Sequence, residues 1–280
     1  MRYFFLLFGF SLSIQAQDDL FSMLEPEPAK PKYVMATFKA TRIVNSQSIE
    51  LVRPQTLEFM IQHRFGSMKN GLYDIFGMDE ASIRFDLHYG ISERISFGVG
   101  RSSLGKTYDI FSKIKLVRQS SNFPISIATY FKTEIETKER LSEFSAEIEN
   151  RLTYDSQLLF ARKINRSISL QLMPTWIHHN WVSSIDKQHD LFSIGVGGRI
   201  KLTKRVSLNA DTFIPINKRV KSFVRSWGIG CDIETGGHVF QLMLTNVQGA
   251  FESIYIENAS GEIQGMDLFL GFNITRAFSI

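Results

Sequence analysis

The sequence has very little cysteine: Cys231 is alone among 280 residues. A disulfide framework is therefore excluded, and the thiol is most simply interpreted as a small apolar side chain on a strand. The chain also lacks any run of ~18 consecutive apolar residues, which excludes a bundle of transmembrane helices. A strong charge of one sign is absent too, because 32 basic residues are balanced by 28 acidic ones. This balance does not favour a nucleic-acid partner.

The first residues, 1–16, are typical of a signal peptide that is removed on export. Arg2 is followed by an apolar stretch at residues 3–10, and cleavage is expected after Ala16. The stretch is shorter than the ~20 residues of a membrane-spanning helix. Residues 17–54 then form an N-terminal segment that begins as a proline-rich linker and continues without a clear strand or helix pattern. We expect its second half to lie against, or inside, the periplasmic mouth of the domain that follows.

From about residue 55 onwards, apolar and polar residues alternate. The clearest example is residues 81–91, whose apolar positions are Ala81, Ile83, Phe85, Leu87, Tyr89 and Ile91. Successive side chains of a β-strand point to opposite faces, so such a segment has one apolar and one polar side. The sequence also holds 24 Phe, 8 Tyr and 3 Trp. A membrane barrel turns many such rings outward, towards lipid and the two interfaces.

About 12 segments of this kind follow one another, most of them near the ~9–11 residues with which a tilted strand crosses a membrane. They cover roughly residues 55–65, 80–91, 93–101, 106–118, 123–134, 150–163, 166–177, 189–202, 205–215, 224–234, 238–246 and 264–278. Short and long connections alternate between them, as in bacterial outer-membrane barrels, which also have even strand numbers. The sequence therefore predicts an all-β fold: a closed antiparallel transmembrane β-barrel over residues 55–280.

This fold predicts a location in the outer membrane of a Gram-negative bacterium. The expected partners are outer-membrane lipid and lipopolysaccharide around the strands, and the barrel-assembly machinery. The chain stops two residues after Phe278, at the end of an amphipathic segment. We expect the assembly machinery to recognise this terminal strand.

The polar face of each strand is expected to face the lumen, because a charged side chain towards lipid costs ~2–4 kcal/mol near the midplane. The ionisable residues expected there are Glu58, Arg64, Arg84, Asp86, His88, Arg94, Asp109, Lys113, Lys115, Arg151, Asp155 and Asp211. One hypothesis is a passive pore or transporter for small polar solutes, selective through these charges. The alternative is a non-conducting barrel that acts as a scaffold or partner of an envelope complex. The strand number does not decide between the two hypotheses, because ~12 strands lie between small filled barrels and open porins of ~16 strands.

No pattern in the sequence indicates catalysis, a cofactor or a metal site. Gly98–Ser103 superficially resembles a dinucleotide-binding loop but lacks the third glycine and the following helix. His178 and His179 are adjacent on an extended chain and point to opposite sides, so they cannot easily share one ion. His88 and Ser96 lack the recognisable spacing of a serine hydrolase. We therefore expect that the protein is not an enzyme.

Several runs resemble a family of exported β-barrel proteins of unknown function that is typical of Bacteroidota. The matching runs are residues 37–43, 48–50, 63–66, 76–79, 83–85, 89–91, 100–103 and 106–109. The resemblance implies an outer-membrane barrel of about this size. It implies no catalytic residues, because the family has no established activity.

Charged residues in the N-terminal segment suggest how it is held. Three of them, Lys39, Arg42 and Glu50, lie in a stretch that is otherwise not strand-like. We expect their side chains to dock the segment onto charged residues of the lumen, namely Arg64, Arg84 and Asp86.

Overall fold

The computed structural model describes residues 32–139, 147–182, 188–217 and 223–280. Those from Tyr33 to Ile280 belong to one compact unit. The expected signal peptide, residues 1–16, lies outside the described residues. Among the residues that are described, no helix is long and apolar enough to cross a membrane.

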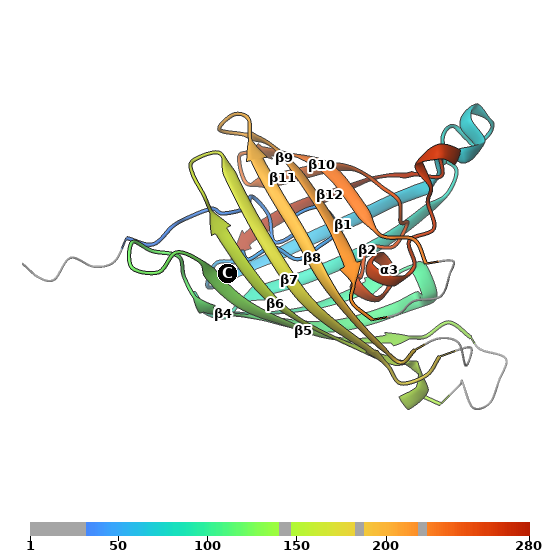
Figure 1. Cartoon of the computed structure of the whole chain (residues 1–280), viewed down its shortest axis with the longest axis horizontal. Helices are drawn as coiled ribbons and strands as arrows, with labels where there is room; N and C mark the ends of the chain where they lie inside the picture. Colours follow the sequence, from blue (N-terminus) through green and yellow to red (C-terminus); the bar gives the residue numbers. More distant parts are fainter. Residues whose placement is uncertain (1–31, 140–146, 183–187, 218–222) are drawn as a thin grey trace, which may run out of the picture. The chain divides into compact units, whose positions relative to one another are not determined.

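The described residues form twelve antiparallel strands that close into one barrel (Figure 1). The strands are β1 (Thr56–Ser67), β2 (Ala81–Gly90), β3 (Ile95–Ser102), β4 (Thr107–Val117), β5 (Ser126–Glu136), β6 (Leu152–Lys163), β7 (Ile168–His179), β8 (Asp190–Lys201), β9 (Val206–Pro215), β10 (Trp227–Thr235), β11 (His238–Thr245) and β12 (Phe269–Ser279). Each strand pairs with its neighbours in sequence, and β1 pairs with β12 from Thr56 opposite Ser279 onwards. The predicted fold class is confirmed. Closure leaves no unpaired sheet edge, which is what a lipid environment requires of a backbone.

The strands bury one face, on which most side chains are polar, and leave the apolar side chains of the other face partly or fully exposed. On β2, Arg84 and Asp86 are 0% and 5% exposed, whereas Phe85 and Leu87 are 45% and 43% exposed. A water-soluble protein keeps contiguous apolar patches of its surface small. A barrel with polar side chains inside and apolar side chains outside is stable where acyl chains cover the outside of the sheet.

The connections sort by length between the two ends of the barrel. Those after the even-numbered strands are short, for example residues 164–167 and 236–237, and we call this the short-turn end. Those after the odd-numbered strands are mostly longer and define the long-loop end. They contain the 3-10 helices η1 (Met68–Asp74), η2 (Leu104–Lys106), η3 (Glu149–Arg151) and η4 (Ile263–Gly265). Short turns at one end and longer loops at the other are typical of bacterial outer-membrane barrels.

The β11–β12 connection departs from the expectation of a simple external loop. It contains a short helix, α3 (Glu252–Glu257), that is turned into the barrel, and its residues Glu252, Ser253, Tyr255 and Ile256 are buried (Figure 1). Alternation in the flanking strands carries no information on this connection, because a loop has no fixed face. The position of α3 inside the barrel depends on residues of the wall and of the N-terminal segment that contact it.

Candidate functional site

Residues 37–50 form a hairpin inside the barrel, which we call the N-terminal hairpin (Figure 1). The chain reverses between Arg42 and Gln47, which form an antiparallel bridge. Backbone hydrogen bonds of 2.9 Å, from Ile43 N to Ser46 O and from Ser48 N to Thr41 O, close the turn. The hairpin is not part of the barrel sheet, so its other buried N–H and C=O groups need partners from the wall.

Asp211 on β9 supplies the acceptor for the tip of the hairpin. Its Oδ2 accepts hydrogen bonds from the backbone N–H groups of Val44 (3.2 Å), Asn45 (2.9 Å) and Ser46 (2.8 Å). The Ser46 hydroxyl donates to the same oxygen at 2.7 Å. One buried carboxylate thus satisfies three consecutive N–H groups that would otherwise lack acceptors.

Lys113 on β4 supplies donors for the hairpin carbonyls. Its Nζ lies 3.3 Å from Thr41 O, 2.9 Å from Ser48 O and 3.1 Å from Glu50 O. An ammonium has three donors, and here each can point at a backbone oxygen. Other wall side chains that donate to carbonyls of the hairpin are Gln171, Arg199 and Gln241.

The hairpin also fills space with apolar side chains. Phe38, Ile43, Val44 and Ile49 belong to one buried cluster that includes inward-facing aromatic and aliphatic residues of the wall. A glycine of the wall leaves room for one of them: a Cβ on Gly197 would lie 2.5 Å from Ile43 Cδ1, too close for a larger residue. The hairpin therefore packs as a core, with shape fit as well as hydrogen bonds.

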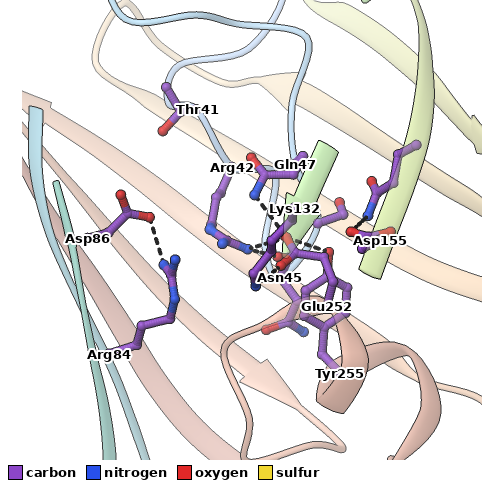
Figure 2. Close-up of polar contacts among 12 residues, drawn as sticks. Thr41, Arg42, Asn45, Gln47, Arg84, Asp86, Lys132, Asp155, Glu252 and Tyr255 are labelled. Carbon is purple, nitrogen blue, oxygen red and sulfur yellow. Dashed lines mark hydrogen bonds and ion pairs between the residues drawn. The ribbon is translucent and has the colours of Figure 1, made fainter. Parts of the chain in front are cut away.

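Helix α3 meets the hairpin from the long-loop end (Figure 2). Glu252 Oε1 lies 3.4 Å from Arg42 Nη1 and accepts a hydrogen bond of 2.9 Å from Gln47 Nε2. Its Oε2 pairs with Lys132 on β5, and Lys132 is also 2.8 Å from Glu134. The hairpin, α3 and the wall thus share one buried ion network across the lumen.

This network shifts the ionisation of Glu252 and Arg42. Burial alone would raise the pKa of Glu252, but Lys132 and Arg42 outweigh it and hold the pKa below its ordinary value. Burial alone would lower the pKa of Arg42, but the negative charge of Glu252, together with smaller contributions from Tyr255 and Tyr130, outweighs burial, and the pKa is raised. Both groups therefore stay charged over the usual pH range, and removing one partner would leave the other as an unpaired buried charge.

Most of the residues predicted to line the lumen lie on the inner face of the wall. Buried there are Arg64, Arg84, Asp86, His88, Asp109, Lys113, Asp155 and Asp211, and half-buried are Glu58 and Lys115. Arg84 pairs with Asp86 at 2.7 Å and with Asp109 at 2.6 Å.

Two predicted lumen residues lie elsewhere. Arg94 is exposed in the turn before β3, because the strand begins only at Ile95. Arg151 lies in η3 at the long-loop end and donates to Lys138 O at 3.3 Å. Each lies one residue before the first residue of a strand, where alternation no longer sets the direction of a side chain.

The predicted docking residues are placed inside the barrel, but with other partners. Lys39 pairs with Glu234 at the short-turn end, and Arg42 pairs with Glu252. Glu50 accepts hydrogen bonds from the backbone N–H groups of residues 37 and 38, within the segment itself. The predicted wall partners were wrong, because Arg84 and Asp86 already pair on the wall. Arg64 reaches the hairpin through Asn45 Oδ1, at 3.3 Å.

Sequence reasoning missed Lys132, Glu134 and Glu252. Lys132 and Glu134 share the buried face of β5 with Tyr130 at every second position, so the same period-two pattern could have found them. Glu252 could not be found this way, because it lies in a connection.

The histidines considered as catalytic or metal-binding residues make contacts with nearby side chains. His88 Nε2 lies 2.8 Å from Ser96 Oγ, but both side chains are buried in the wall. His178 pairs with Asp190 and His179 with Glu257, so the two adjacent rings are directed to different partners. Within the described ranges, no group of three or more His, Cys, Asp and Glu residues is placed to hold a metal ion.

These features define a class: a membrane β-barrel with a porin-like sheet whose interior is occupied by its own chain. Its fold is similar to that of the NanC porin (TM-score 0.50, 7% identity, covering 80% of this chain and 100% of that one). It is also similar to the KdgM porin (TM-score 0.51, 8% identity, covering 79% and 99%). At such identities the likeness concerns the fold alone, and no curated protein matches the chain in sequence.

The chain belongs to the membrane bound beta barrel domain family DUF5777, whose model matches residues 38–278. The match confirms the resemblance to an uncharacterised barrel family, while the origin in Bacteroidota stays a prediction. The matched region begins at Phe38, so it contains almost the whole N-terminal hairpin together with the strands.

Proposed function

We propose that the protein is a porin-like barrel of a Gram-negative outer membrane that is closed by its own chain. Small polar solutes pass when the N-terminal hairpin leaves the lumen. The observation that carries this proposal is the contact of Arg42 with Glu252, because it joins an element entering from the short-turn end to one entering from the long-loop end. Together these elements occupy the middle of the barrel.

The polar wall supports a passage once the hairpin is displaced. Lys113 and Asp211 hold the hairpin through its backbone and not through matched apolar side chains. Water or a polar solute can replace such backbone partners at little cost, because it supplies the same donors and acceptors. Arg84, Asp86 and Asp109 would remain on the wall as charged groups facing the solute.

The apolar contacts favour a second candidate, a barrel that never conducts. Phe38, Ile43 and Val44 are buried with residues of the wall in one cluster. A permanent core of this kind is what a scaffold for an envelope complex would need. In both candidates the barrel is proposed to act without catalysis, and lipid and the assembly machinery remain its proposed partners.

Conductance in planar bilayers separates the candidates. We expect the wild-type protein to be closed for most of the time and Asp211→Ala to open about tenfold more often, since unsatisfied buried N–H groups cost roughly 1–3 kcal/mol. Asn209→Ala is the matched control, because this inward-facing residue of β9 makes no hydrogen bond to the hairpin. A wild-type protein that is steadily open would contradict closure by the hairpin. Silence of Asp211→Ala, and of a variant with residues 37–50 replaced by a flexible linker, would establish the non-conducting alternative.

A disulfide supplies the reverse test. A Cβ on Gly228 would lie 2.8 Å from Val44 Cγ1, which is close enough for cysteines at positions 44 and 228 to be linked. In an Asp211→Ala, Cys231→Ser background, the oxidised pair should stay closed, and reduction should restore the openings. Equal conductance before and after reduction would show that the current does not depend on the hairpin.

A further inference from the structure

A cavity of about 510 Å³ lies at the long-loop end, between the ends of β4–β7 and the β11–β12 connection. We call it the vestibule. Thr153 and His179 of the wall, with Trp181 of the connection after β7, line one side, and Phe251, Ile254 and Ser260 line the other. Its volume falls in the range of about 300–1,000 Å³ that is usual for small-molecule sites.

Helix α3 separates the vestibule from the N-terminal hairpin. Phe251, Ser253 and Ile254 line the vestibule. Tyr255 and Ile256 belong to the buried cluster that includes the hairpin, and Glu252 pairs with Arg42. Residues at i, i+3 and i+4 of a helix share one face, so this short helix presents one side to the cavity and the other to the hairpin.

The lining indicates the chemistry of a ligand. Two carboxylates, Glu134 and Glu136, and two cationic side chains, Lys138 and Arg151, line the vestibule, so their formal charges cancel. Glu134 is already paired with Lys132 and accepts a hydrogen bond from Ser253. A ligand with a net charge would meet groups of both signs and would gain little over water. Hydroxyl and amide groups among aromatic and aliphatic side chains suit an uncharged molecule with several hydroxyls.

We propose that the vestibule binds a small uncharged, hydroxyl-rich solute, up to about the size of a disaccharide. Binding is coupled through α3 and Glu252 to the N-terminal hairpin. The cavity exists while α3 is seated, so a bound solute stabilises the seated helix and, through Arg42, the docked hairpin. The concentration of solute outside the membrane thereby changes the stability of the docked N-terminal hairpin, which enters the barrel from the periplasmic side. This inference rests on the closure in the proposed function, but not on conductance.

Binding is tested with maltose as the probe, on the full mature chain in detergent, by the melting temperature and by the fluorescence of Trp181 in a Trp176→Phe, Trp227→Phe background. We expect saturable binding of maltose, and at least fivefold weaker binding of the charged sugars galacturonate and glucosamine. Ser260→Phe fills the vestibule and should abolish binding. Ser121→Phe, the same change at an exposed site of the short-turn end, should leave it intact. Lack of saturation, or normal binding by Ser260→Phe, would overturn the site. Equal binding of a charged sugar would overturn the ligand class.

Coupling is tested by hydrogen exchange of residues 37–50 with and without maltose. Wild-type exchange should slow by at least fivefold at saturation, as expected for coupling free energies that shift affinity about 5- to 150-fold. By the same linkage, Arg42→Gln should weaken maltose binding, although Arg42 does not line the vestibule. Gln47→Ala, which removes a milder contact with Glu252, is the second variant in case Arg42→Gln does not fold. Unchanged exchange and unchanged affinity would overturn the coupling. Channel openings of Asp211→Ala remain a separate test of closure.

Discussion

At the scale of single residues, Glu252 connects three parts of the molecule. Its carboxylate pairs with Arg42 of the hairpin and Lys132 of the wall, and it belongs to α3. Three of the buried ions thus depend on one another, so that loss of one leaves charges that neither water nor lipid can solvate. The arrangement gives the closed state a defined dependence on pH.

The expected dependence follows from the pKa of Glu252, which Lys132 and Arg42 lower against the opposing effect of burial. A carboxyl with a lowered pKa in the folded state adds stability above its unfolded pKa of about 4.3, and this stability is lost as the pH falls through the folded pKa. We expect the difference in unfolding free energy between wild type and Glu252→Gln to stay constant from about pH 8 to about pH 5 and to shrink below about pH 4. Denaturant titrations in detergent at a series of pH values measure it. A difference that shrinks instead between pH 5 and 8 would contradict the proposed ion network.

At the scale of elements, α3 is too short to be stable alone. Its six residues form less than two turns, whereas isolated helices need ~12–15 residues to be even marginally stable in water. Docking must therefore hold it in place. At its C-terminal end, Glu257 Oε2 lies 3.0 Å from His179 Nε2, and the other ring nitrogen of His179 lies 3.0 Å from Thr153 Oγ1.

His179→Ala should loosen α3 without opening the barrel sheet. Loss of a partly buried hydrogen bond costs roughly 1 kcal/mol, so exchange of the α3 amides should accelerate about fivefold. His238→Ala, at the start of β11, is the control, because its ring contact is with Phe240. Equal exchange in both variants would show that α3 is held mainly by its apolar face.

The elements also show how far the sequence could predict the structure. Alternation located all twelve strands, because the direction of a strand side chain depends only on its neighbours in sequence. The pattern failed one residue before the start of β3, at Arg94, and it could not predict α3. The docking partners of Lys39, Arg42 and Glu50 could not be predicted either, since charge alone does not say which of many lumen ions is already paired.

At the scale of the whole molecule, the outward apolar residues require lipid. Leu172 lies in the middle of β7 and is 51% exposed, while Leu202 lies in the β8–β9 turn and is 55% exposed. Leu172→Arg should reduce the unfolding free energy in lipid vesicles by ~2–4 kcal/mol, and Leu202→Arg by ~0–1 kcal/mol, because the cost of a cation depends on its depth. Equal costs at the two positions would contradict the assigned membrane span.

The sequence by itself determined the strands, their inner and outer faces and the need for a membrane, because these follow from a period of two and from the composition. Only the tertiary structure decided that the lumen is filled. The deciding contacts join residues far apart in the chain, such as Val44 with Asp211 and Arg42 with Glu252. Alternation says which side chains face the interior. What occupies that interior depends on which distant segment has hydrogen-bond donors, acceptors and a volume that match the wall. This match exists only in the folded barrel, where segments far apart in the sequence come together.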